Sequence, residues 1–179
     1  MNIQIRQESK VDYQSVFELI RKAFEHEEYS DHQEQFLVER LRLSSGFIPE
    51  LALVAEIHGK IVGYILLTKI KICNEAKKRE YPSLALAPIA VLPEFKGRGI
   101  GGRLIAEAHR IATELDFGSI ILLGHASYYP KFGYVRMAKY GIKMPFEVPN
   151  EHCMVIELRQ QALAGVQGTV VYPKEFGIA

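Results

Sequence analysis

Cysteine, tryptophan and long hydrophobic runs are what this 179-residue sequence has least of. It contains two cysteines, Cys73 and Cys153, and no tryptophan. Two isolated cysteines are too few for a disulfide framework or a zinc site, so we expect no disulfide and no metal. No apolar run approaches the length that spans a membrane, and the N-terminus lacks the pattern of a signal peptide. These absences predict a cytoplasmic protein with no membrane partner.

An excess of either charge is also lacking. The sequence has 22 lysines and arginines against 21 aspartates and glutamates, a net charge of +1. Such a balance gives no general attraction to nucleic acid. The length suits one domain with a substantial core. We therefore predict a single domain over residues 1–179, with a core at about 3–140 and a C-terminal extension at 141–179 whose role stays open. A homodimer also stays open.

The hydrophobic patterns predict one α/β unit. A short strand includes Ile3 and Ile5, and Asp12 is the expected N-cap of a helix with Tyr13, Phe17, Ile20 and Phe24 on its buried face. The later elements are expected in this order: a helix at 36–43, strands at 51–57 and 61–72 joined by a hairpin at 58–60, a loop at 74–80, a strand at 84–92, a helix ending near 115, and strands at 119–123, 134–142 and 154–158. Residues 165–179 carry no pattern that we can assign.

A glycine-rich turn is the most informative feature that the sequence does have. The run Lys96-Gly97-Arg98-Gly99-Ile100-Gly101 follows the apolar strand at 84–92 and opens the amphipathic helix. Glycines let the backbone N–H groups of such a turn point inward, and the first helical turn adds unpaired amides and the positive end of the dipole. Lys96 and Arg98 add positive charge. The turn is therefore expected to bind a phosphate or pyrophosphate.

Two common nucleotide-binding motifs fit this turn poorly. Residues 97–102 satisfy the pattern G-x-G-x-x-G, but three residues separate the turn from its strand, and the next strand ends in Gly124-His125 rather than in the acidic residue that would hold a ribose. A Walker A loop requires lysine and a hydroxyl residue after its last glycine, whereas Gly102-Arg103 follows Gly101 here.

The segment 89–101 resembles motif A of the GNAT acetyltransferases, whose core is Gln/Arg-x-x-Gly-x-Gly/Ala. Lys96 stands where the family usually has arginine or glutamine. A second block, Tyr128-Tyr129-Pro130-Lys131-Phe132-Gly133-Tyr134, is similar to the family's later Phe-Tyr-x-x-x-Gly-Phe motif. The two blocks and the predicted order of elements resemble the family over roughly residues 3–140. The resemblance implies an α/β fold with a mixed, splayed central sheet flanked by helices, and acetyl-CoA as the cofactor.

The resemblance also implies a set of site residues. Tyr129 matches the family's general-acid tyrosine, and a phenol is protonated at neutral pH and can donate to a departing thiolate. Pro88, which lacks an amide hydrogen, fits a bulge or an unpaired position in the central strand, and the free edge of that strand can pair with the amide chain of pantetheine. The expected cofactor-binding residues are Ile89, Ala90, Val91, Lys96, Gly97, Arg98, Gly99, Ile100, Gly101, Gly102, Tyr129 and Phe132.

The base and the acceptor are less determined by the sequence. His125, at the end of a strand, is the first candidate for the base; Glu27 or Glu28 acting through water is the next, and the amine could also arrive neutral. The acceptor is expected to lie against residues 24–36 and the strands after Tyr134. The predicted function is transfer of acetyl from acetyl-CoA to a primary amine of a small molecule or protein, by direct attack through a tetrahedral intermediate. The alternative is a catalytically silent acyl-CoA-binding sensor or scaffold.

Overall fold

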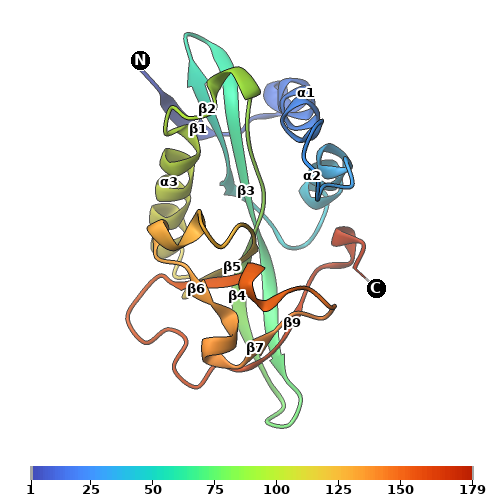
Figure 1. The fold of residues 1–179 in the computed structure, drawn as a ribbon, viewed down its shortest axis with the longest axis vertical. Coiled ribbons are helices and arrows are strands. Elements are labelled where there is room, and N and C mark those ends of the chain that lie inside the picture. The colour runs from blue at the N-terminus through green and yellow to red at the C-terminus, as the bar shows by residue number, and fades with distance from the viewer. Residues whose placement is uncertain (1, 179) are drawn as a thin grey trace.

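The computed structural model describes residues 2–178 and has one mixed sheet with helices on both faces of its upper half (Figure 1). The three α-helices of this part of the chain are α1 (Tyr13–Phe24), α2 (Glu34–Arg42) and α3 (Ile100–Glu114). Its strands are β1 (Gln4–Gln7), β2 (Phe47–Ile57), β3 (Lys60–Asn74), β4 (Arg79–Val91), β5 (Ser119–Leu123), β6 (Val135–Arg136), β7 (Ile142–Lys143), β8 (Cys153–Glu157) and β9 (Gly168–Val171).

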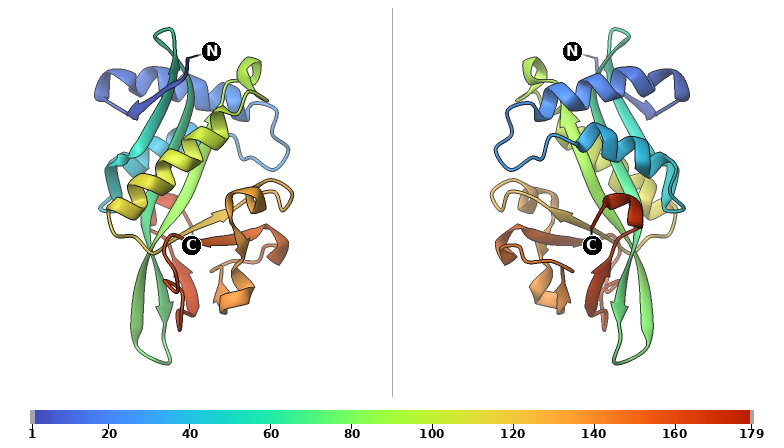
Figure 2. Two further views of the ribbon diagram at one scale, coloured as in Figure 1. Left: turned by 90° about the vertical axis from the view of Figure 1, so that its left-hand side faces the viewer. Right: turned by 90° about the vertical axis from the view of Figure 1, so that its right-hand side faces the viewer.

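The sheet runs in the order β1-β2-β3-β4-β5-β8-β6, and β9 pairs with both β3 and β7. In its upper half α3 covers one face, while α1 and α2 cover the other (Figures 1 and 2). The apolar residues between these layers form the larger of two hydrophobic clusters, and a second cluster lies among the C-terminal strands. The predicted fold class and the predicted order of elements through β5 are confirmed.

The part of the sheet that matters for the site is the junction between β4 and β5. These strands are parallel, and their register includes only the pairs Leu84–Ile120 and Ala85–Ile121. β4 continues to Val91 beyond these pairs, so the two strands splay apart. On its other side β4 stays paired with β3, with a bulge where Ala87 and Pro88 face one β3 residue. The predicted bulge at Pro88 is therefore confirmed.

The start of α1 differs from the prediction. Asp12 is the N-cap residue of α1, as predicted, but its carboxylate caps no helix amide. It accepts hydrogen bonds from the backbone N–H and the hydroxyl of Ser9, both at 2.8 Å, and forms an ion pair with Arg6 at 2.7 Å. A single-turn 3-10 helix, Lys10–Asp12, therefore leads into α1. The fully buried face is also rotated from the predicted one and comprises Val16, Leu19, Ile20 and Ala23.

The predicted loop at 74–80 was wrong because β3 and β4 extend into it. They pair as far as Asn74 and Arg79, and their long hairpin projects from the molecule (Figure 2). Lys71 of β3 forms an ion pair with Glu80 of β4 at 2.7 Å. The charged residues therefore lie on the solvent-exposed face of this hairpin, and Ile70 and Ile72 are buried on its other face.

The chain after Tyr134 also departs from the prediction. Residues 134–142 are not one strand: a 3-10 turn, Met137–Tyr140, separates β6 from β7 and places Met137 in the second hydrophobic cluster. The strand predicted at 154–158 is confirmed as β8 within one residue at each end. The unassigned tail forms β9, where a Cβ on Gly168 would overlap the carbonyl of Cys73. Only glycine allows this close approach of β9 to β3.

Candidate active site

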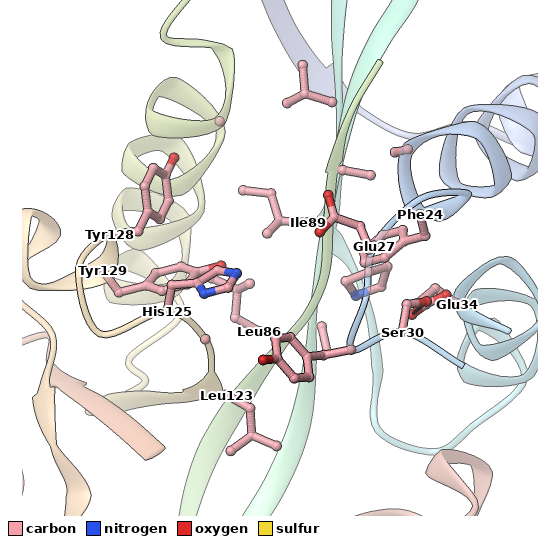
Figure 3. A pocket seen from close by; sticks show the side chains of 18 of the residues that line it. Phe24, Glu27, Ser30, Glu34, Leu86, Ile89, Leu123, His125, Tyr128 and Tyr129 are labelled. Carbon is pink, nitrogen blue, oxygen red and sulfur yellow. Dashed lines mark hydrogen bonds between the residues drawn. The ribbon is translucent and has the colours of Figure 1, made fainter. Parts of the chain in front are cut away.

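The gap between β4 and β5 opens on a cleft of about 1550 Å³. Figure 3 shows Tyr128, Tyr129 and His125 on one side of this cleft, and Phe24, Glu27, Ser30 and Glu34 on the other. Ile89 of β4 lies between the two sides. The sheet thus brings together four segments far apart in the sequence: the region between α1 and α2, the end of β4 with the glycine turn, the segment after β5, and the loop before β8.

The glycine turn lies at one end of the cleft in the conformation that its glycines allow. Gly97 and Gly99 both have φ of +77°, in the left-handed region, and Gly99 is the N-cap of α3. Since the first amides of a helix have no partner within it, those at the start of α3 are available to an anion. Every residue of the turn from Lys96 to Gly102 lines the cleft except Arg98. The Arg98 guanidinium lies over the ring of Phe95, at 5.2 Å from its centroid.

Small residues at the start of α3 let aromatic rings close over it. A Cβ on Gly101 would come within 3.1 Å of the Tyr128 hydroxyl, and one on Gly102 within 3.3 Å of the Phe132 ring. The ammonium of Lys131 lies 4.0 Å from the centroid of the Tyr128 ring. The sequence did not single out Lys131, yet it lines the cleft beside the turn and adds positive charge there.

The free edge of β4 forms the floor of the cleft. Ile89, Ala90 and Val91 pair with β3 on one side, and their register with β5 has already ended at Ala85. All three line the cleft. An extended ligand with amide groups can therefore pair with this edge as an added strand would.

The Tyr129 phenol is enclosed on several sides. Its residue is 9% exposed, and its ring lies against Gly124, where a Cβ would overlap the ring. The rings of Tyr128 and Tyr134 meet it edge-on, with centroids at 5.0 Å and 5.8 Å. Burial, with a smaller contribution from Tyr128, raises the pKa of Tyr129 to about 12. The phenol therefore keeps its proton at neutral pH.

The candidate bases differ in their placement. His125 is exposed and lines the cleft, and its carbonyl accepts the backbone N–H of Tyr128 at 3.0 Å. Glu27 lines the cleft as well, but its carboxylate forms an ion pair with Lys96 at 3.0 Å. Glu28 does not contribute to the cleft lining.

The segments predicted to hold the acceptor line the cleft only in part. Phe24, Glu27, Tyr29, Ser30 and Glu34 of the predicted segment 24–36 do line it. The strands after Tyr134 do not: that wall comes from the loop before β8 and includes Val148, Pro149, Glu151 and His152. No local motif marks this loop, because only the pairing of β8 with β5 brings it to the cleft.

A sheet that splays between two parallel strands, with a glycine turn and a helix N-terminus at the opening, is the fold of an N-acyltransferase. The acetyltransferase (GNAT) family model matches residues 13–134, and this chain belongs to that family. The resemblance seen in the two sequence motifs is thereby confirmed.

Bacterial relatives agree with this assignment. The chain is 34% identical to the uncharacterized N-acetyltransferase YjhQ of Escherichia coli K12 over 145 residues, which are 80% of this chain and 76% of YjhQ. It is similar in structure to the GNAT acetyltransferase YhbS of Escherichia coli in complex with CoA, with a TM-score of 0.88, 25% identity, and coverage of 99% of this chain and 93% of YhbS. A GNAT acetyltransferase of Brucella melitensis in complex with acetyl-CoA gives a TM-score of 0.80 at 27% identity, with 98% of each chain covered.

Proposed function

We propose that this protein transfers the acetyl group of acetyl-CoA to a primary amine. One observation carries the proposal: the glycine turn, the free edge of β4 and the buried Tyr129 phenol all face a single cleft. Binding of CoA to YhbS and of acetyl-CoA to the Brucella melitensis protein supports the same cofactor here.

The donors present in the cleft fit coenzyme A. The turn from Gly97 to Gly102 offers backbone amides and a helix N-terminus to a pyrophosphate, with Lys96 and Lys131 beside it. The edge of β4 offers N–H and C=O groups to a chain that contains amides. Because Ile89 and Val91 are half-buried and apolar, they suit the methylene groups of such a chain.

The proposed chemistry assigns Tyr129 as general acid. Bound acetyl-CoA would supply a thioester whose leaving group is a thiolate. Tyr129 holds its proton at Oη because burial raises its pKa. It can therefore donate that proton as the thiolate leaves. An unpaired amide of the β4 edge can donate to an oxygen that gains negative charge.

The opposite side of the cleft suits a cationic amine. Glu27 and Glu34 line it, and because Glu27 is already paired with Lys96 of the turn at 3.0 Å, Glu34 is the carboxylate left to attract a cation. One oxygen of Glu34 accepts the hydroxyl of Ser30, and the other is buried without a hydrogen-bond partner within residues 2–178. Carboxylates attract the ammonium form of an amine. His125 is proposed as the base that removes its proton, with Glu27 acting through water as the alternative.

The test measures release of CoA and formation of an acetylated product. Acetyl-CoA is incubated with the protein and a panel of polyamines, amino acids, aminoglycosides and peptides with free N-termini, and the products are identified by mass spectrometry. We expect one amine class to be acetylated, with turnover that falls at least tenfold in Tyr129→Phe. CoA binding without acetylation of any amine would favour the silent acyl-CoA-binding module. Tighter binding of NAD or ATP than of CoA would exclude both the acetyltransferase and the acyl-CoA-binding module.

A further inference from the structure

A partly buried histidine on α3, His109, lies close to the proposed acid. The ring of Tyr134 meets the ring of Tyr129 edge-on, with centroids 5.8 Å apart. On its far side the Tyr134 hydroxyl lies 2.8 Å from Nε2 of His109, a hydrogen-bond distance. Tyr134 is 2% exposed, so its orientation is fixed by packing and by this bond.

We propose that His109 and Tyr134 are positioning residues, which act as a pair to hold the Tyr129 phenol in its place in the cleft. The inference rests on the proposed function, since it concerns the orientation of the proposed acid. Neither residue is among those that line the cleft, and Tyr134 contacts Tyr129 directly, so the pair acts on the site through its neighbours.

Packing connects the pair to Tyr129. Tyr129 opens the 3-10 turn Tyr129–Phe132, which contacts α3, the helix that carries His109. Gly124 bounds one side of the Tyr129 ring, and Tyr128 and Tyr134 meet its edges. Of these neighbours, Tyr134 is the one tied to α3 by a hydrogen bond. Without that bond Tyr134 can shift, and because its ring contacts the Tyr129 ring, the Tyr129 ring can shift as well.

The charge state of His109 keeps the bond constant over the working pH range. Burial lowers the pKa of His109 to about 4, so the imidazole is neutral at physiological pH. Burial, with a smaller contribution from Tyr129, raises the pKa of Tyr134. A neutral imidazole and a neutral phenol form one hydrogen bond without a buried charge.

The kinetic test removes the bond from either side. His109→Phe keeps an aromatic ring, and Tyr134→Phe removes only the hydroxyl. With an acceptor identified by the panel, each variant should lower kcat about three- to tenfold, as expected for one lost hydrogen bond. The dissociation constant for CoA should change less than twofold. The double variant should be no slower than the slower single variant, because both changes remove the same bond.

Two further variants separate positioning from general stability. His109→Gln keeps a polar group that can reach the Tyr134 hydroxyl, and it should retain most of kcat. Tyr140→Phe removes a tyrosine hydrogen bond of the same length, 2.8 Å to Glu157, in the second hydrophobic cluster, and should leave kcat unchanged. Unchanged kcat in folded His109→Phe and Tyr134→Phe would overturn the proposal, and so would an equal loss in Tyr140→Phe.

A measurement without any substrate completes the test. The NMR signals of the Tyr129 ring, assigned by their loss in Tyr129→Phe, should move in His109→Phe and Tyr134→Phe but not in Tyr140→Phe. If the wild-type protein acetylates no amine, the proposed function fails and these signals alone decide the positioning. Unmoved Tyr129 signals overturn it, and displaced signals support it. If the wild type is active and Tyr129→Phe is equally active, the positioning role falls while the acetyltransferase function stands.

Discussion

The ammonium of Lys96 lies 3.0 Å from the carboxylate of Glu27. This ion pair joins the glycine turn to the segment between α1 and α2 across the cleft, and it pairs a predicted cofactor-binding residue with a candidate base. Both side chains are about half exposed, at 52% and 46%, so the pair itself adds little stability. A bound pyrophosphate at the turn would compete with Glu27 for the Lys96 ammonium.

Removing the Glu27 charge should therefore tighten CoA binding. In Glu27→Gln, Lys96 no longer has a carboxylate partner, and we expect the dissociation constant for CoA to fall about two- to fivefold at low salt, the size of a surface pair. Lys96→Gln should raise it. Isothermal titration calorimetry measures both. Glu94→Gln is the matched control, because Glu94 pairs with Lys60 at 3.4 Å outside the cleft. Unchanged CoA affinity combined with a large loss of kcat in Glu27→Gln would identify Glu27 as the base instead.

The glycine turn should lose its ligand when its backbone is strained. Gly99→Val places a β-branched side chain at φ of +77°, and Gly101→Val brings a Cβ within 3.1 Å of the Tyr128 hydroxyl. We expect each to weaken CoA binding tenfold or more, as measured by calorimetry. Gly59→Val is the control, since Gly59 has φ of +78° in the β2–β3 hairpin away from the cleft. A loss of affinity in the control as large as in Gly99→Val would point to general strain rather than to the turn.

The two neighbouring tyrosines should separate binding from chemistry. Tyr129→Phe keeps the ring and its packing, so we expect normal folding, unchanged CoA affinity and a loss of turnover of at least tenfold. Tyr128→Phe should keep most of the turnover. Its hydroxyl lies at the start of α3, so any effect should fall on the KM for acetyl-CoA. Steady-state kinetics of the two variants decides between them, and a large loss of kcat in Tyr128→Phe alone would show that Tyr128 is the acid.

Glu34 should affect the amine rather than the cofactor. Its carboxylate has a buried oxygen without a hydrogen-bond partner within residues 2–178, and the residue lines the side of the cleft proposed for the amine. Glu34→Gln keeps the shape and removes the charge, and we expect the KM for the amine to rise about three- to tenfold with the KM for acetyl-CoA unchanged. Glu39→Gln, on the same helix but not in the cleft lining, is the control. Equal KM values for the amine in wild type and Glu34→Gln would remove Glu34 from the acceptor site.

His109 should make the protein less stable in acid. Its pKa in the folded state is lowered to about 4, whereas an unfolded histidine titrates near 6.5. Between these values the unfolded state binds one more proton, so the free energy of unfolding falls as the pH drops from about 6.5 to about 4. Urea unfolding of wild type and His109→Gln at several pH values measures this. The stability difference between the two should move in favour of His109→Gln as the pH falls, and a difference independent of pH would contradict a neutral imidazole in the folded state.

The sequence by itself determined the parts that depend on neighbouring residues. The glycine turn, the strand before it and the helix after it form one continuous signal, and Gly99 does adopt the left-handed backbone that only glycine favours. The tyrosine block and the order of elements through β5 were sufficient to indicate the family. Pro88 likewise marked its own bulge, because a missing amide hydrogen is a local property.

Tertiary structure alone decided which distant segments meet. The pairing of β8 with β5 carries the loop 148–152 to the cleft, and nothing in that loop's own sequence indicates its neighbour. The same holds for β9 on β3 and for the contact between His109 and Tyr134, which lie 25 residues apart. Asp12 stands at the predicted N-cap position, but its carboxylate bonds to Ser9 and Arg6 rather than to a helix amide. Periodicity reports how a segment folds, whereas burial, ion pairing and strand register depend on partners that only the folded chain supplies.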